Sequence, residues 1–170
     1  MADVVTPEVR SRMMAGIGPK DTKPELAIRR ALHARGLRFR LGSNYRRKGK
    51  LLVGKPDLVF PARKAVIFVH GCFWHGHDCA LFKWPARGEN TDEEAKWRKK
   101  LTANILRDRK TLNRLFETGW RVLEVWECTL KGRNRKPFDE VITRCCAFLE
   151  GTEPFSSIGG SQTVTVDVSA

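Results

Sequence analysis

The sequence predicts an α/β protein with one domain, in which helices flank a mixed β-sheet. Short apolar segments of strand-like composition alternate along it with longer segments of helical periodicity. A chain of 170 residues suits one domain, and a hydrophobic content of 41% is enough for a real core. The longest aliphatic and aromatic run, residues 65–69, is far too short to cross a bilayer.

The first half of the chain predicts one helix and three strands. A helix is expected over residues 21–36, which open with capping residues and end at a glycine. Residues 37–41 alternate with period two, which predicts a strand with one buried face. A basic loop follows over residues 42–54. Two short apolar strands then occupy residues 56–60 and 65–70, and the second lacks polar alternation, so we expect both of its faces to be covered.

The second half predicts two helices around one strand. A capping-box pattern opens a long helix over residues 91–119, and a buried strand is expected over residues 120–126. A basic loop at residues 131–136 leads to a final helix over residues 137–150. The core order is therefore α-β-β-β-α-β. Residues 151–170 lack Lys and Arg and are rich in Ser, Thr and Gly, so we expect a flexible polar tail.

The positive charge is concentrated in two regions. The formal net charge is +13, but the segments 38–55 and 96–136 carry +7 and +9, which leaves −3 for the rest of the chain. Regional positive charge on a globular domain is typical of proteins that bind a polyphosphate, because each cation near the backbone releases condensed counterions. The alternative is a solvated basic face without a partner. An anionic membrane is a poorer match, because the basic stretches do not form one amphipathic helix.

The segment from His70 to Cys79 holds three of the four histidines and two of the five cysteines. A structural zinc site takes four Cys or His ligands. Cys72, His77 and Cys79 are close enough to supply three of them, and Cys128 supplies the fourth if the strand before it lies nearby. Such a closed site leaves no position for a reactive water, so it would organise the loop without catalysing a reaction. The alternative is buried apolar cysteines with incidental histidines.

Five further side chains suit hydrolytic chemistry, and each has a structural alternative. Asp57, beside a basic loop, is a suitable Mg²⁺ ligand, but Pro-Asp pairs also form turns. His70 and His75 lie on the braced loop, where a histidine serves either as a general base or as a structural hydrogen-bonding group. Asp108 falls on the apolar stripe of the long helix, so it needs a partner such as His75 or an arginine. Glu25 has the spacing of a capping box.

Phe73 and Trp74 lie in the segment from His70 to Cys79, which we call the histidine loop. A third aromatic residue, Trp97, lies on the long basic helix. Apolar side chains that insert between base steps kink duplex DNA. Trp97 also fits a core stripe, whereas two adjacent aromatics in a polar loop flanked by glycines fit a core less well.

With these motifs assembled, the sequence resembles the Vsr endonucleases of very-short-patch repair, a branch of the PD-(D/E)xK nuclease superfamily. The similarity runs from about residue 10 to residue 135 and is carried by residues 11–17, 56–57, 66–75, 79–83, 104–109 and 119–128. The superfamily's core has the element order derived above. The resemblance adds an N-terminal arm over residues 1–20 that contacts DNA and an endonuclease domain over residues 21–150. This chain departs from the family pattern in its longer and more basic loop between Gly42 and Gly54.

The resemblance implies a role for each of the catalytic candidates. Asp57 looks like the Mg²⁺ ligand, together with the main-chain carbonyl of Val69. His75 looks like the general base that activates water, and Asp108 would orient its imidazole. His70 looks like a second histidine near the scissile phosphate.

The resemblance also covers the remaining candidates. Glu25 matches an acidic residue near the Mg²⁺ site. The ligands of the structural Zn²⁺ match Cys72, His77, Cys79 and Cys128. The intercalating wedge matches Phe73, Trp74 and Trp97, with Met14 entering from the other groove.

The family resemblance implies a Mg²⁺-dependent enzyme that nicks one strand of duplex DNA on the 5′ side of the thymine in a T:G mismatch. Such mismatches arise when 5-methylcytosine deaminates. We expect a cytoplasmic monomer that acts with a repair polymerase, a ligase and mismatch-repair factors and has no membrane partner. The rival interpretations are a non-catalytic zinc module that binds mismatched or bent DNA and, less favoured, a zinc hydrolase for a small substrate.

Overall fold

A four-stranded mixed sheet organises the part of the chain that the computed structural model describes, residues 21–84 and 91–159. Its strand order is β3-β4-β5-β6. Strand β3 (Leu58–Phe60) runs antiparallel to β4 (Ala65–His70). Strands β4, β5 (Arg121–Trp126) and β6 (Phe155–Ile158) are parallel to one another. The prediction of a mixed sheet is confirmed.

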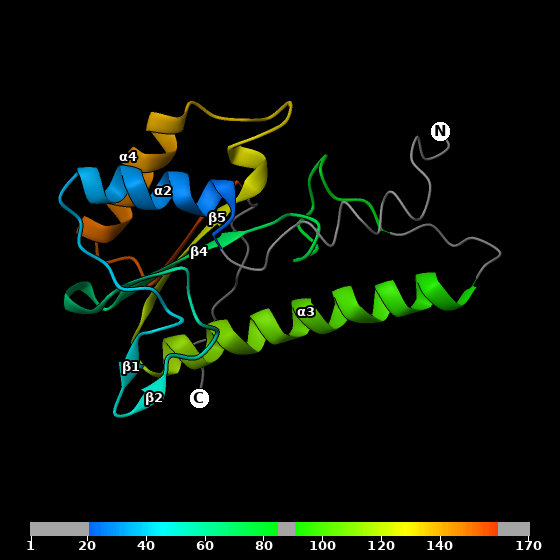
Figure 1. Ribbon diagram of the computed structural model, residues 1–170, viewed down its shortest axis with the longest axis horizontal. Coiled ribbons are helices and arrows are strands. Elements are labelled where there is room, and N and C mark those ends of the chain that lie inside the picture. The colour runs from blue at the N-terminus through cyan, green and yellow to red at the C-terminus, as the bar shows by residue number, and fades with distance from the viewer. Residues whose placement is uncertain (1–20, 85–90, 160–170) are drawn as a thin grey trace.

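Three helices cover the sheet within the described residues. Helices α2 (Lys23–Ala34) and α4 (Phe138–Glu150) lie on one face, and the long helix α3 (Thr91–Glu117) lies on the other (Figure 1). Each helix ends within two residues of its predicted bounds. Two short 3₁₀ turns, Pro61–Arg63 and Glu127–Thr129, follow β3 and β5. The α/β class is therefore confirmed.

The side chains of β4 show why both faces of the sheet need cover. Ala65 and Ile67 belong to the core under α2 and α4, whereas Val66 and Phe68 belong to the core under α3. Because successive side chains point to opposite faces, a strand without polar alternation can be stable only between two layers. This confirms the prediction made from its continuous apolar sequence.

The strand predicted over residues 37–41 is wrong in its extent. Only Arg40 pairs with the sheet, through two backbone hydrogen bonds of 2.8 Å to Val59. Leu37 and Phe39 still pack against the core, as the period-two pattern requires. The next hydrogen-bonded pair of an antiparallel ladder would be Arg38 with Pro61. Proline has no N–H to donate, so the pairing stops after one residue.

Part of the predicted basic loop forms a hairpin instead. Strands β1 (Arg46–Arg47) and β2 (Lys50–Leu51) pair antiparallel across a turn at Lys48 and Gly49. Both turn residues have positive φ, 49° and 77°. This combination is the I′ type that matches the twist of a hairpin, and it is usually signalled by Asn-Gly rather than Lys-Gly.

The expectation of a tail from residue 151 is corrected for residues 155–158. They form the edge strand β6, whose Phe155 and Ile158 are register partners of Val122 and Val125. The buried Ser157 hydroxyl accepts a hydrogen bond of 3.1 Å from the indole N–H of Trp126. The sequence did not predict this strand because Ser156 and Ser157 make it half polar. The hydrogen bond that satisfies the buried Ser157 hydroxyl forms only in the folded protein. Residues 160–170 lie outside the described part.

The predicted N-terminal arm, residues 1–20 with Met14, also lies outside the described residues. Among the helices that are described, none combines the length and the apolar character that spanning a membrane requires.

Candidate active site

Several residues singled out in the sequence converge where β4 and β5 end. His70 closes β4 and Trp126 closes β5, and the two are register partners. Asp57 directly precedes β3, and because β3 runs antiparallel to β4, its start lies beside the end of β4. Loop residues 71–84 and the middle of α3 complete this edge. The sheet topology thus gathers side chains that are far apart in the sequence.

Asp57 is a carboxyl group whose surroundings oppose its ionisation. Burial, assisted by the negative charge of Glu25, raises the pKa of Asp57 to about 6. A hydrogen bond of 2.7 Å from the Val69 N–H to Oδ2 acts in the opposite direction, as do the positive charges of His70 and Arg29. The raised pKa shows that these groups only partly compensate the charge of Asp57, and a buried carboxylate of this kind suits a hard divalent cation.

Glu25 takes part both in capping helix α2 and in the electrostatic environment of Asp57. Its Oε1 accepts a hydrogen bond from the Thr22 hydroxyl at 2.9 Å, and the Glu25 N–H donates to that hydroxyl at 3.5 Å, so Thr22 caps the helix as in one half of a capping box. Oε2 accepts hydrogen bonds from the main chain of Asp21 at 3.1 Å and from Arg29 at 3.0 Å. The same buried carboxylate raises the pKa of Asp57, so it also belongs to the electrostatic environment of the site.

His75 and Asp108 form a histidine–carboxylate pair. The distance from His75 Nδ1 to Asp108 Oδ2 is 2.6 Å, and Arg107 approaches the other carboxylate oxygen at 3.6 Å. Burial lowers the pKa of His75 below 6.5, although Asp108 opposes this shift. Burial alone would raise the pKa of Asp108, but the hydrogen bond and the charge of His75 hold it below its ordinary value. The pair therefore suits a neutral imidazole with Nδ1–H bound to a carboxylate, which leaves Nε2 as a proton acceptor.

His70 lies beside this pair in an aromatic setting. Its ring centroid is 4.2 Å from that of His75 and 5.0 Å from that of Trp126, and it stacks on Phe68 at 5.3 Å. Its Nε2 is 3.4 Å from Oε1 of Glu124, and both side chains are buried. The stacking holds the ring of His70 in one orientation between the sheet and the loop.

A second group of side chains forms a candidate metal centre. Atoms of Cys72, His77, Cys79 and Cys128 that can bind a metal all lie within 4.8 Å of one another. Burial raises the pKa of the Cys72 thiol and of the Cys128 thiol, so a metal ion would have to displace their protons. Three thiols and one imidazole are a donor set typical of tetrahedral structural zinc. Trp126 stacks on the His77 ring with centroids 4.1 Å apart, which joins this cluster to the end of β5.

Three aromatic side chains meet at the outer side of the histidine loop. The ring centroids of Phe73, Trp74 and Trp97 are 5.4 to 6.2 Å apart. The Lys100 ammonium lies 5.1 Å from the centroids of both tryptophans. All three aromatic residues are only partly buried. They form a compact apolar cluster with a cation beside it, as a surface that stacks on bases requires.

The histidine loop is held against α3 by two contacts. The Asn104 side-chain amide donates a hydrogen bond of 3.2 Å to the main-chain carbonyl of Trp74. Gly76 has φ of +62°, and a Cβ at this position would lie 2.5 Å from Cδ1 of Ile105. Only glycine fits so close to the helix in this conformation. These contacts place His75 and Trp74 relative to the helix that carries Asp108 and Trp97.

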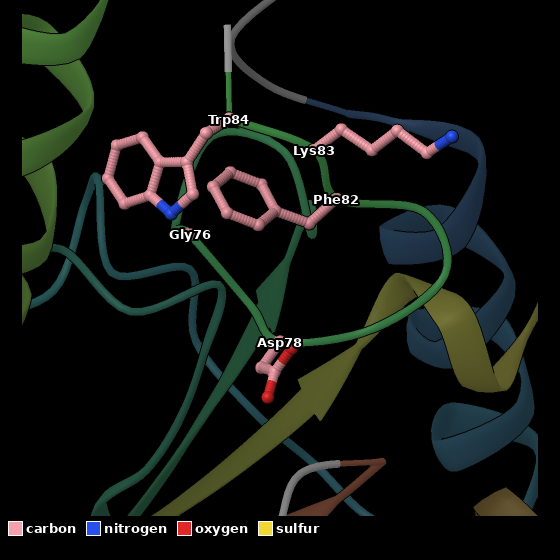
Figure 2. Close-up of a pocket in the computed structure, with 5 residues that line it drawn as sticks. All are labelled: Gly76, Asp78, Phe82, Lys83 and Trp84. Atoms are coloured by element: carbon pink, nitrogen blue, oxygen red, sulfur yellow. The ribbon is translucent and has the colours of Figure 1, made fainter. Parts of the chain in front are cut away.

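A pocket of about 380 Å³ opens beside the aromatic cluster. Figure 2 shows the residues that line it, which are Gly76, Asp78, Phe82, Lys83 and Trp84. The rings of Phe82 and Trp84 lie side by side in this view, with centroids 5.2 Å apart. Phe82 also contacts Phe73 at 6.4 Å, so the pocket continues the aromatic surface.

The structure brings together all of the predicted site residues that it describes, in three neighbouring groups. Sequence reasoning missed Glu124, the acidic residue inside a buried strand, although a charged residue at such a position is itself a signal. It also missed Lys100, which nothing in the basic pattern of α3 distinguishes from its neighbours. The contact of Lys100 with two tryptophans depends on the loop that folds over the helix.

Comparison with known proteins shows that this chain is similar to DNA mismatch endonucleases and nicking enzymes. A family model described as DNA mismatch endonuclease Vsr matches residues 2–81. The DNA mismatch endonuclease Vsr of Escherichia coli (strain K12) is 45% identical over 143 residues, which are 84% of this chain and 84% of the relative. The type II nicking enzyme V.XorIIP of Xanthomonas oryzae pv. oryzae is 44% identical over 76% of this chain and 88% of its own length. V.NmeAIP of Neisseria meningitidis serogroup A, also a type II nicking enzyme, is 42% identical over 78% of this chain and 87% of its own length.

Proposed function

Because this chain belongs to the Vsr family of DNA mismatch endonucleases, we propose that it nicks one strand of duplex DNA on the 5′ side of the thymine in a T:G mismatch. The observation that carries this proposal is the His75–Asp108 pair, which is linked to Asp57 through His70: the His70 ring lies 4.2 Å from that of His75, and its charge acts on the Asp57 carboxyl. A binding module would have no use for a neutral histidine oriented by a carboxylate next to two further acidic groups.

In the proposed reaction His75 is the general base. Asp108 accepts the hydrogen bond from Nδ1–H and fixes the imidazole so that Nε2 faces away from the helix carboxylate. Nε2 then takes a proton from the water that attacks the phosphodiester. The lowered pKa keeps the imidazole neutral at pH 7, which is the state that a base requires.

Asp57 and the Val69 main-chain carbonyl would hold Mg²⁺, with Glu25 close by. Bound there, Mg²⁺ supplies positive charge for the phosphate oxygens and the leaving oxygen. His70, stacked on Phe68 and in tilted contact with Trp126, would donate a hydrogen bond to the scissile phosphate. Zn²⁺ at the Cys/His cluster would brace the loop that carries His75, without taking part in the reaction.

The proposal is tested with a panel of end-labelled duplexes that contain T:G, each other mismatch, or no mismatch. Reactions with Mg²⁺ are compared with reactions in Mg²⁺-free buffer, because a chelator would also remove zinc. We expect one nick, in the thymine strand of the T:G duplex, and only with Mg²⁺. Cleavage of matched DNA at the same rate, or binding without cleavage, would contradict the proposal.

His75→Ala should reduce the nicking rate about 10²- to 10⁴-fold, the usual contribution of a general base. Asp108→Asn should cause a smaller loss, because asparagine retains a hydrogen-bond acceptor but not the charge. Single-turnover rates at saturating protein measure both effects. The exposed His33 provides the matched control, since His33→Ala should nick at the rate of the unmodified protein. A His75→Ala rate within a few-fold of that value would rule out the assigned role.

The cluster of Phe73, Trp74 and Trp97 is proposed to enter the base stack at the mismatch. Trp74→Ala should weaken binding to the T:G duplex about 5- to 150-fold, which corresponds to the loss of one stacking contact of about 1–3 kcal/mol. Binding to matched duplex should change much less, because a regular stack is harder to open. Titrations of both duplexes at one salt concentration measure the difference. Phe138→Ala, which removes an exposed ring from α4, should change neither affinity, and equal losses on both duplexes for Trp74→Ala would argue against a wedge.

A further inference from the structure

The β1–β2 hairpin carries an unusual density of cations. Arg46, Arg47, Lys48 and Lys50 lie within five residues, and all four are exposed. Within the described residues, none of these side chains approaches a carboxylate within the 4.0 Å of an ion pair. Such uncompensated charges repel one another, so the fold gains nothing from placing them together. The stability of the fold therefore does not explain this concentration of positive charge.

The hairpin is firmly attached to the core beneath it. Tyr45, just before β1, packs edge-on against Trp120 with ring centroids 5.9 Å apart, and Leu52, just after β2, is buried. Gly54 has φ of +74°, and a Cβ there would lie 2.2 Å from the Thr111 methyl group of α3. These contacts hold the base of the hairpin against the helix, so its cations occupy a defined position.

The cations of the hairpin face the last turns of α3. Figure 1 shows the hairpin beside the C-terminal end of this helix. A hollow of about 550 Å³ separates the two elements, and its charged lining consists of Arg47, Lys48, Lys50, Arg114 and Glu117. Four cations against one carboxylate leave this hollow strongly positive.

A row of cations on α3 leads from this hollow to the proposed active site. Lys100, Arg107, Lys110 and Arg114 are exposed and are spaced by seven, three and four residues, which places them on one face of a helix. Lys100 lies over the aromatic cluster, and Arg107 contacts Asp108. At 1.5 Å per residue the row is about 21 Å long. It therefore joins the wedge, the catalytic pair and the hairpin.

From this placement we infer that the hairpin and the row on α3 form one track that binds the DNA backbone on one flank of the nick. The ligand, duplex DNA, rests on the proposed function. With about 3.4 Å between phosphates along the axis of one strand, a 21 Å row corresponds to about six nucleotides. The hairpin lies at the far end of this row, where it contacts phosphates and reads no bases. It adds affinity for any duplex and leaves mismatch recognition to the aromatic cluster.

The track is tested with the triple variant Arg47→Gln, Lys48→Gln, Lys50→Gln. All three side chains are exposed, so the substitutions should leave folding unchanged. Binding of matched duplex is measured in Mg²⁺-free buffer over a series of salt concentrations. Each lost phosphate contact should reduce the slope of log K against log [salt] by about 0.9, so the full loss is about 2.7. At low salt and saturating protein, the single-turnover nicking rate and the preference for T:G should stay those of the unmodified protein.

A matched control removes the same charge from the opposite side of the sheet. Arg30→Gln, Arg35→Gln and Arg38→Gln change exposed cations on and just after α2, which lies across the sheet from α3. This variant should keep the original slope. An unchanged slope in the hairpin variant, or an equal decrease in the control, overturns the inference. Because binding is measured without cleavage, this failure is distinct from an absence of nicking at T:G.

Shortening the duplex tests the direction of the track. When the duplex is trimmed from one end to within a few base pairs of the mismatch, the hairpin variant and the unmodified protein should bind with equal affinity. Trimming the other end by the same length should preserve their difference. If neither trimming removes the difference, the hairpin does not lie along one flank, and the track as proposed is wrong.

Discussion

Replacing Asp57 by asparagine should abolish nicking and at the same time stabilise the Mg²⁺-free protein. Nicking is lost because an amide is a poor ligand for Mg²⁺. Stability increases because the fold raises the pKa of this carboxyl from 3.8 to about 6, so ionising Asp57 is more costly in the folded chain than in the unfolded one. At pH 7 this penalty is about 2–3 kcal/mol, and asparagine avoids it.

The stability difference between Asp57→Asn and the unmodified protein should depend on pH, because the fold raises the pKa of Asp57. As the pH falls through about 6 the folded protein takes up a proton at Asp57, and below 3.8 both states are protonated. The stability advantage of Asp57→Asn should therefore be complete above pH 6 and vanish below pH 4, as denaturant unfolding in Mg²⁺-free buffer measures. In the unmodified protein, the Mg²⁺ concentration for half-maximal nicking should rise as the pH falls below about 6, because Mg²⁺ then competes with a proton.

Asp139→Asn is the matched control for Asp57→Asn. Asp139 is an exposed carboxylate on α4, with only a distant contact of 3.8 Å to Arg35, so both nicking and stability should remain unchanged. Two results would count against the role of Asp57. One is an Asp57→Asn variant that nicks at the normal rate with Mg²⁺, and the other is a variant that is less stable than the unmodified protein at pH 7.

Cys128→Ala should remove the bound zinc and destabilise the fold by at least several kcal/mol. Structural zinc contributes an apparent 10–16 kcal/mol to the folding of small zinc domains. Here the Cys/His cluster adjoins only a small apolar group around Trp126, so the metal would be the main support on this side of the loop, whose other side is held by Asn104 and Asp108 of α3. Because that loop carries Trp74 and His75, nicking should be lost together with the metal. Zinc content per chain, the unfolding midpoint and the nicking rate measure the three effects.

Cys145→Ala separates the loss of a metal ligand from the loss of a buried thiol. Cys145 lies in the core under α4, away from the Cys/His cluster, and is fully buried. Its replacement should cost about 1 kcal/mol, as small core truncations do, with one zinc per chain retained. If Cys128→Ala keeps a full complement of zinc and the normal unfolding midpoint, the cluster is not a structural zinc site.

The residues of the candidate site could be singled out from the sequence because their chemistry is local in the sequence. Three histidines and two cysteines lie at or just after the end of one buried strand, and a carboxylate interrupts the apolar stripe of a helix. Both patterns are improbable without a partner, since burying an unpaired charge is costly. The pairing itself was not determined, because the sequence offered either His75 or an arginine as the partner of Asp108. In the folded protein Asp108 contacts both, with His75 much the closer.

Two errors in the fold came from elements whose stability depends on their surroundings. The edge strand β6 is half polar and is recognisable only once Trp126 is available to bind Ser157. The β1–β2 hairpin has almost no strand propensity of its own, and it depends on Tyr45 and Leu52 to pack against the core under α3. In both cases the stabilising contact comes from residues distant in sequence or outside the strand itself.

The sequence alone determined the α/β class, the helices with their ends, the doubly covered strand and most of the candidate site residues. These follow from periodicity, from capping and from the cost of burying polar groups, all of which act over a few neighbouring positions. Only the tertiary structure decided which of these residues meet. The parallel pairing of β4 with β5 brings His70 to Trp126, and the packing of α3 across that sheet brings Asp108 to His75 and a row of cations to the hairpin. Such contacts depend on how whole elements pack, which no local pattern encodes.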